Sequence, residues 1–111
     1  MLTLCDIWSA RQRIADVLRP TPLLPSPVLR RWSGSEVRLK PECLQTTGSF
    51  KIRGAVNKIR SLGGKARRVV ACSSGNHGQA TAFAAQQAGM AATIVVPRRT
   101  APNKIEAIRA W

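Results

Sequence analysis

Residues 73–78 (SSGNHG) combine two glycines with polar side chains that carry no net charge. They follow an apolar segment and precede an alanine-rich one, so we expect them to join the carboxyl end of a strand to a helix. Loops in this position bind ligands in open α/β sheets, because backbone N–H groups and the helix dipole face the crevice. The loop therefore suits a carboxylate or phosphate. Alternatively, Ser73, Ser74 and Asn76 only cap the helix.

Lys51 is a second candidate, because it stands directly after Phe50, two residues after Ser49, at the expected start of a helix. A lysine amine that attacks an aldehyde is activated by burial and by neighbouring positive charge. The alternative is an ordinary solvated lysine, since Arg53 and Lys58 follow closely in the sequence. Taken alone, the position leaves both interpretations open.

Two segments together resemble the motifs of a known family. Residues 40–55 (KPECLQTTGSFKIRGA) are similar to the segment that carries the pyridoxal phosphate (PLP) lysine in enzymes with the tryptophan synthase β fold. Residues 73–80 (SSGNHGQA) are similar to the substrate loop of these enzymes, and residues 21–23 and 94–97 match in the same order. From Thr21 onward the chain resembles the serine racemase and serine/threonine dehydratase family. The implied fold class is α/β, with an incomplete open parallel sheet and flanking helices, truncated relative to the family.

The resemblance implies a role for each matched residue. Lys51 is expected to bind PLP covalently and to move the proton at the α-carbon of the substrate. Phe50 is expected to lie against the pyridine ring, and Asn76 to hydrogen-bond the phenolic oxygen of the cofactor. The loop expected to hold the substrate carboxylate consists of Ser73, Ser74, Gly75, Asn76 and His77.

Ser74 bears on the reactions that the family resemblance implies. Serine racemases have serine here, on the ring face opposite the lysine, whereas many threonine dehydratases have alanine. Racemisation needs a proton donor on each face, so Ser74 permits it without requiring it. The implied activity is a PLP-dependent lyase, a serine or threonine dehydratase (ammonia-lyase) that converts L-serine and L-threonine to 2-oxo acids, with serine racemase activity left open.

The elements expected around these residues form an incomplete sheet with helices. Residue patterns predict helices over 4–18, from 50 to 62, up to residue 88 and from residue 102, with strands over 36–40, 69–72 and 92–96. The prolines of residues 20–27 predict that 21–28 runs extended. Ser49 is expected to cap the helix that follows it. The strand 69–72 lacks alternation, which predicts that both of its faces are covered.

The resemblance also implies a division into domains. Residues 1–45 are expected to be a segment of the larger family domain, and residues 46–111 most of the smaller, substrate-loop domain. In the family, the glycine-rich loop for the PLP phosphate and any metal-binding carboxylates lie further downstream. We therefore expect an N-terminal fragment, inactive alone, of an enzyme that forms a homo-oligomer at full length. A mini-enzyme that completes its site by oligomerising is a second hypothesis.

Charge, cysteine content and hydropathy limit which other classes of protein the chain could belong to. Eighteen Lys and Arg against five Asp and Glu give a net charge of +13, which suits a non-enzymatic, basic nucleic-acid-binding module as a third hypothesis. The charge is spread along the chain, however, and aromatic residues are few, so nucleic acid is not the expected partner. Three separated cysteines and one histidine predict no metal site. Neither a membrane segment nor a signal peptide is recognisable, so we expect a cytoplasmic protein.

Overall fold

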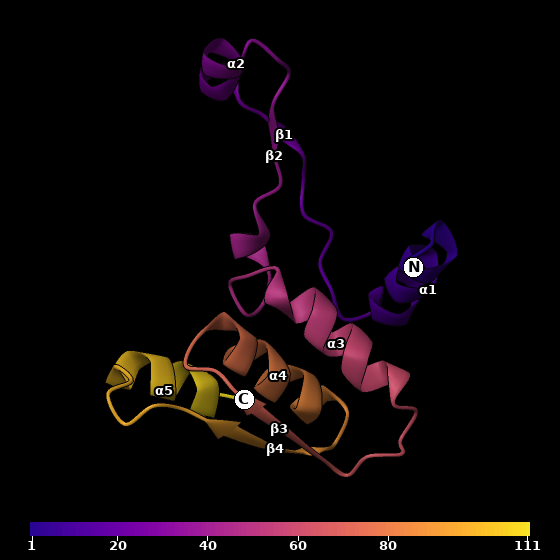
Figure 1. Cartoon of the computed structure of the whole chain (residues 1–111), viewed down its shortest axis with the longest axis vertical. Coiled ribbons are helices and arrows are strands. Elements are labelled where there is room, and N and C mark those ends of the chain that lie inside the picture. Colours follow the sequence, from indigo (N-terminus) through magenta and orange to yellow (C-terminus); the bar gives the residue numbers. More distant parts are fainter.

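The computed structural model describes residues 1–111, the whole chain. In chain order the elements are α1 (Leu4–Ile14), β1 (Leu24–Pro25), α2 (Pro27–Ser33), β2 (Arg38–Leu39), the 3-10 helix η1 (Glu42–Leu44), α3 (Lys51–Ser61), β3 (Arg68–Cys72), α4 (Asn76–Gln87), β4 (Ala91–Val95) and α5 (Pro102–Arg109). Figure 1 shows two parts of the molecule: a body, formed by α3, β3, α4, β4 and α5, and an arm, formed by β1, α2 and β2, that projects from it. The N-terminal helix α1 lies beside the body.

The centre of the body is a parallel β3–α4–β4 unit, which confirms the predicted α/β class. The two strands pair in register from Arg68 opposite Ala91 to Cys72 opposite Val95. Each strand begins one residue before its predicted start. The sheet has only these two strands, so it is incomplete, as the resemblance implied.

The prediction that both faces of β3 are covered is wrong for this chain. Exposure alternates along the strand, with Val70 67% exposed and its neighbours Val69 and Ala71 half-buried. Val95 of β4 is likewise 51% exposed. Helix α4 packs on one face of the sheet, and within residues 1–111 no layer covers the other face.

The core lies where α3 crosses α4. The predicted apolar face of α3 is confirmed, because Ile52, Val56 and Ile59 are buried against α4. Alanines on the facing side of α4 allow the two helices to approach closely, since a methyl group is the smallest apolar side chain. Phe83 of α4 meets Trp111 edge-on, with ring centroids 5.1 Å apart. Helix α3, the second of the predicted helices, therefore supplies much of the hydrophobic core of the body.

Helix α1 begins as predicted and ends earlier. Thr3 caps it through a capping box, in which the Asp6 N–H donates to Thr3 Oγ1 and the Thr3 N–H donates to the Asp6 carboxylate. The helix ends at Ile14 instead of residue 18, and the chain continues in turns towards Pro20, which disfavours helix before it. Leu18 nevertheless reaches the core from these turns.

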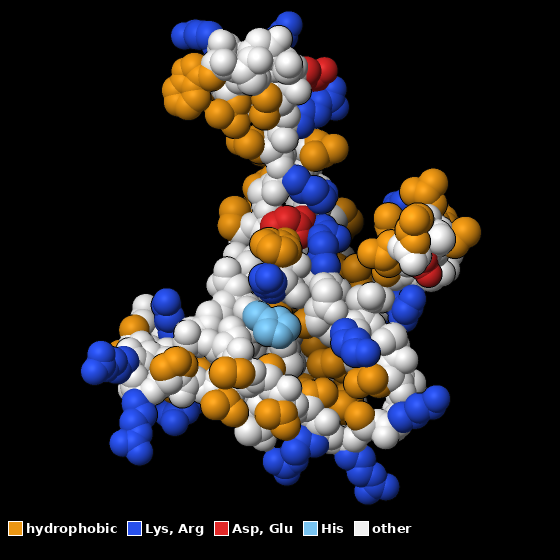
Figure 2. Space-filling view, in the orientation of Figure 1, with side chains coloured by type: hydrophobic (Ala, Val, Ile, Leu, Met, Phe, Trp, Pro, Cys, Tyr) orange, Lys and Arg blue, Asp and Glu red, His pale blue; other side chains and the backbone are white.

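The arm contains α2, which the sequence analysis did not predict. Residues 21–28 were expected to run extended, yet Pro27 begins a helix, because proline is favoured in the first helical turn and Ser26 caps it by accepting from the Leu29 N–H. The predicted strand 36–40 is reduced to two residues that pair antiparallel with β1. Apolar side chains such as Trp32, 78% exposed, remain on the surface of the arm (Figure 2). None of the helices is both long and apolar enough to cross a lipid bilayer.

Candidate functional site

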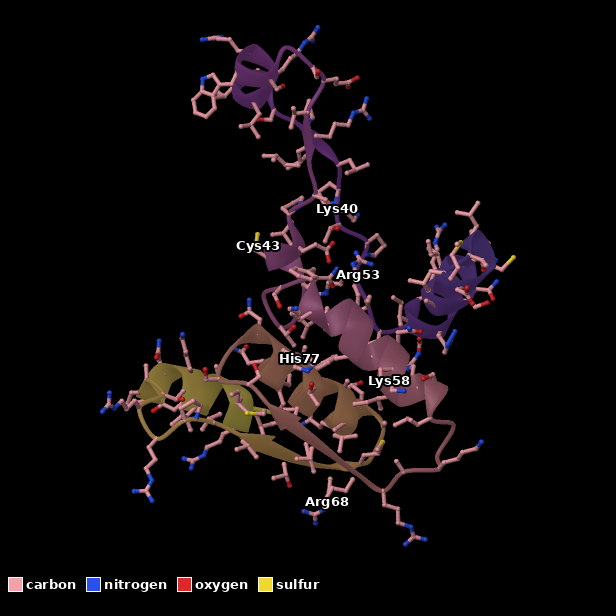
Figure 3. All side chains as sticks on the ribbon, viewed as in Figure 1. Lys40, Cys43, Arg53, Lys58, Arg68 and His77 are labelled. Carbon is pink, nitrogen blue, oxygen red and sulfur yellow. The ribbon has the colours of Figure 1, made fainter.

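A cavity of about 590 Å³ lies between α3, β3 and α4. Phe50 and Lys51 line it at the start of α3, and His77 lines it from the first turn of α4. Figure 3 labels His77 together with Arg53 and Lys58, which also line the cavity. The middle of β3 supplies apolar wall, and Arg53 and Lys58 add positive charge. Lys51 and His77, which belong to two different motifs and lie 26 positions apart in the sequence, therefore meet at one cavity.

Lys51 is the first residue of α3 and its side chain is exposed. Its Nζ atom lies 5.0 Å from the centroid of the Phe50 ring, within the range of a cation–π contact. Of the two conditions that activate a lysine amine, burial is not met within this chain. Neighbouring positive charge is present, because Arg53 and Lys58 line the same cavity.

The loop 73–75 lies at the carboxyl end of β3, as predicted, and leads directly into α4. The Ser73 N–H donates to the Val95 carbonyl at 3.0 Å, which extends the sheet pairing by one residue. The Gly75 N–H donates to Ser73 Oγ, and no side chain caps the N-terminus of α4. The alternative in which serines and Asn76 only cap the helix is therefore not what the structure contains.

The predicted site residues are brought together only in part. His77 lines the cavity with Lys51, whereas Asn76 is exposed and does not line it. The half-buried residues Ser73, Ser74 and Gly75 belong to the adjoining loop and also lie outside the cavity wall. Within this chain the cavity beside Lys51 is thus lined by His77 and not by Asn76.

Gly78 has a packing role that its place at the end of the polar loop does not predict. It is buried in the first turn of α4, and a Cβ at this position would lie 3.1 Å from Ile94 Cγ2 of β4 and 3.2 Å from Ile108 Cδ1 of α5. The same Cβ would lie 2.5 Å from the backbone carbonyl oxygen of Ser73, closer than a Cβ can approach, so a glycine is required for the start of α4 to pack against the sheet. The sequence offers only a glycine inside a polar motif as a signal for this role, because its burial appears only in the folded chain.

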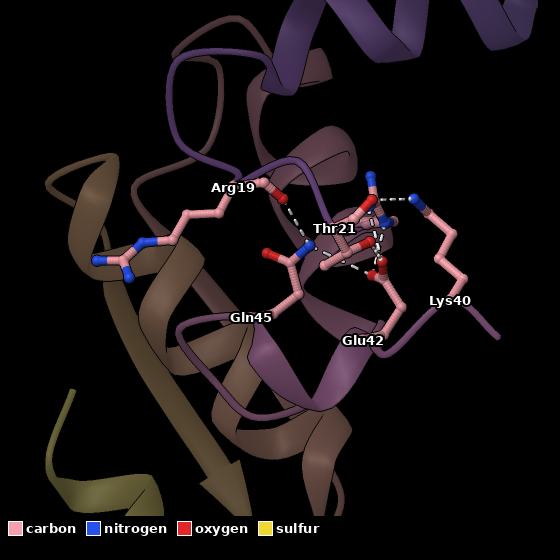
Figure 4. Close-up of polar contacts among 6 residues, drawn as sticks. Arg19, Thr21, Lys40, Glu42 and Gln45 are labelled. Atoms are coloured by element: carbon pink, nitrogen blue, oxygen red, sulfur yellow. Dashed lines mark hydrogen bonds and ion pairs between the residues drawn. The ribbon is translucent and has the colours of Figure 1, made fainter. Parts of the chain in front are cut away.

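A polar network just before α3 was also missed (Figure 4). The Glu42 carboxylate accepts two hydrogen bonds from Arg53, from Nε at 2.7 Å and from Nη2 at 2.8 Å, and a third from Thr21 Oγ1 at 2.5 Å. The Arg53 guanidinium is the main reason that the pKa of Glu42 falls to about 2, against the opposing effect of desolvation. Glu42 raises the pKa of Arg53 in turn.

The segment between this network and Lys51 has an unusual pattern of burial. Gln45, Thr47 and Ser49 are 4%, 5% and 6% exposed, and the residues between them are exposed. The prediction that Ser49 caps α3 is wrong, because Phe50 is the N-cap, no side chain caps the helix, and Ser49 Oγ is buried without a partner. Thr47 Oγ1 is also unpaired. Gly48, with φ of 67°, makes the turn that directs these side chains inward.

Known proteins resemble the chain over nearly its full length. An L-threonine ammonia-lyase of Thermotoga maritima is 50% identical over 111 residues, a match that covers 98% of this chain and 28% of that protein. A serine racemase of Rattus norvegicus is 47% identical over 116 residues, covering 99% of this chain and 34% of that protein.

The solved structure of serine racemase from Dictyostelium discoideum superposes on this chain with a TM-score of 0.90 and 40% identity, covering 98% of this chain and 36% of that one. The chain thus spans between 28% and 36% of the length of these relatives. The model of the family described as "Pyridoxal-phosphate dependent enzyme" matches residues 14–111. Because this match extends over most of the sequence, the chain belongs to the family of pyridoxal-phosphate-dependent enzymes.

Proposed function

We propose that the chain is part of a PLP-dependent ammonia-lyase that acts on L-serine and L-threonine, with Lys51 as the residue that binds the cofactor. The observation that carries this proposal is that Lys51 and His77, from the two family motifs, line one cavity with Phe50. The names of the relatives support the substrate class, since they include an L-threonine ammonia-lyase and a serine racemase.

The residues present fit one end of PLP, an anionic aromatic aldehyde. The cavity combines apolar walls with a primary amine, an aromatic ring beside that amine, and the positive charges of Arg53 and Lys58. An aromatic compound with a negative charge suits this combination. The residues that hold its phosphate are expected outside this chain, as the family resemblance implies.

PLP, when bound, supplies a conjugated ring that withdraws electrons from the substrate α-carbon. Lys51 would take the proton from that carbon, and the backbone N–H groups at the start of α4 would bind the substrate carboxylate. We assign Asn76 to the cofactor and Ser73, Gly75 and His77 to the substrate carboxylate. Ser74 would donate a proton from the opposite face, which would allow racemisation of serine beside elimination of its hydroxyl group.

We further propose which form of the protein is active, where it acts and how the chain divides into domains. The 111-residue chain by itself is expected to be inactive, and the longer enzyme to be a cytoplasmic homo-oligomer. The division into a larger-domain segment (1–45) and a smaller domain (46–111) is part of the same proposal. Release of 2-oxo acid from L-serine or L-threonine by the isolated chain would contradict the inactive state.

Absorbance spectroscopy with PLP tests the assignment of Lys51. The purified chain mixed with PLP should develop the visible band of lysine-bound cofactor, and Lys51→Ala should abolish it. Lys65→Ala is the matched control, because Lys65 is an exposed lysine that does not line this cavity and its loss should leave the band in place. An unchanged band in Lys51→Ala would show that other lysines react and would overturn the assignment.

A further inference from the structure

We propose that Glu42 and Arg53 form a positioning pair that holds the first turn of α3, and with it Lys51, in place at the cavity. This inference rests on the proposed role of Lys51. Arg53 is two residues after Lys51 in the same helical turn and lines the same cavity. Any movement of the Arg53 backbone therefore moves the attachment point of the lysine side chain.

Core packing supports one side of the start of α3, because Ile52 in its first turn is fully buried. Polar support from the preceding loop is weaker. No side chain caps the helix, and its first turn follows a loop in which the hydroxyls of Thr47 and Ser49 are buried without partners. Buried polar groups without partners cost free energy, so these two hydroxyls do not stabilise the loop. A polar contact that orients this turn therefore comes from outside the loop.

The ion pair supplies that anchor from the opposite end of the loop. Glu42 belongs to η1, and both of its carboxylate oxygens receive a hydrogen bond from Arg53, at 2.7 Å and 2.8 Å. Such bidentate, charge-assisted bonds fix orientation as well as distance. The Glu42 side chain is only 15% exposed and that of Arg53 36%, so solvent screens the pair less than an exposed one.

Further donors tie Glu42 to the N-terminal segment. Thr21 Oγ1 donates to Glu42, and Lys40 Nζ donates to the Thr21 carbonyl oxygen at 3.0 Å (Figure 4). Gln45 Nε2 donates to the Arg19 carbonyl oxygen at 3.0 Å. Thr21 and Arg53, from two other segments of the chain, thus both donate to the Glu42 carboxylate. Lys40 and Gln45 hold the backbone of residues 19–21 beside it, so the turn that carries Lys51 is tied to the N-terminal segment.

The chain offers a matched control in Glu36. Glu36 and Arg38 form another ion pair with a 2.7 Å contact, but their side chains are 64% and 57% exposed, and they lie on the arm. Glu42→Gln and Glu36→Gln remove the same charge by the same change. Only Glu42→Gln loosens the positioning pair, and Arg53→Lys keeps the charge while losing the bidentate geometry.

The test combines hydrogen exchange with the rate at which PLP modifies Lys51, followed by borohydride reduction and peptide mapping. In Glu42→Gln, amide exchange should rise within residues 46–53 while α4 and β4 stay protected. Modification of Lys51 should slow about tenfold, within the range expected when a reacting group is misplaced. Glu36→Gln should match the unsubstituted chain, and Arg53→Lys should fall between the two.

Unchanged exchange and unchanged modification in Glu42→Gln would overturn the positioning role. Faster exchange spread evenly over the whole chain would overturn it as well, since the pair would then be a general stabilising contact. If Glu42→Gln does not fold, Arg53→Lys decides, and a rate equal to that of the unsubstituted chain would reject the inference. Failure of PLP to modify Lys51 in the unsubstituted chain would instead overturn the proposed function.

Discussion

The backbone of Gly78 lies so close to Ser73 that a Cβ on residue 78 would be 2.5 Å from the Ser73 carbonyl oxygen. This approach brings the first turn of α4 against the end of β3, where the polar loop begins. The start of α4 and the loop can keep this geometry only if residue 78 has no side chain. The contact therefore ties the sheet to the segment that we assign to the substrate.

Gly78→Ala is predicted to lower the free energy of unfolding by about 1–3 kcal/mol, the usual cost of forcing a methyl group into a packed site. Urea denaturation measures this change. Gly54→Ala is the control, because Gly54 lies within α3 with no atom that would meet a Cβ within 4 Å. That change should stabilise the chain by about 0.5–1 kcal/mol. Equal effects of the two substitutions would contradict the packing at Gly78.

Acid is predicted to weaken the fold through Glu42. Its pKa is about 2 in the folded chain against an ordinary value of 4.5, so its hydrogen bonds stabilise the fold fully above about pH 4.5 and less as the pH falls towards 2. Between about pH 6 and about pH 3, the unsubstituted chain should lose about 1–2 kcal/mol more stability than Glu42→Gln. Urea denaturation at each pH checks this. Parallel losses in both proteins would assign the effect to other carboxylates.

Ser49→Ala is predicted to leave stability within about 1 kcal/mol of the original or to raise it, because the buried hydroxyl has no partner to lose. Thr3→Ala removes a cap that the structure contains, and should cost about 1 kcal/mol. Both are measured by denaturant unfolding. A loss in Ser49→Ala as large as that in Thr3→Ala would restore the original prediction that Ser49 caps α3.

Local signals allowed much of the fold to be predicted. The apolar segments that became β3 and β4, and the glycines after α3 and α4, are short-range features, so these elements were predicted to within one or two residues. The prolines of residues 20–27 predict an extended chain, and for this reason helix α2 was not predicted. Pro27 instead follows Ser26, a combination that starts a helix.

Site residues that belong to a linear motif could be predicted from the sequence. Contacts between residues that are distant in the sequence could not. Lys51 and the loop that contains His77 were recognised as linear motifs, and the structure places these two residues at one cavity. The network of Glu42 depends on Thr21 and Arg53, which lie 21 and 11 residues away in the sequence. The spacing of apolar and polar residues along the sequence does not indicate such contacts, because they form only when the segments pack together.

The most direct test is to find which lysine PLP modifies. The chain is incubated with PLP near neutral pH, reduced with borohydride, digested, and mapped by mass spectrometry for the modified fraction at Lys40, Lys51, Lys58, Lys65 and Lys104. Modification concentrated at Lys51 is the predicted result. An even distribution over the five lysines, or a preference for any other, would contradict the assignment of Lys51 as the cofactor-binding residue.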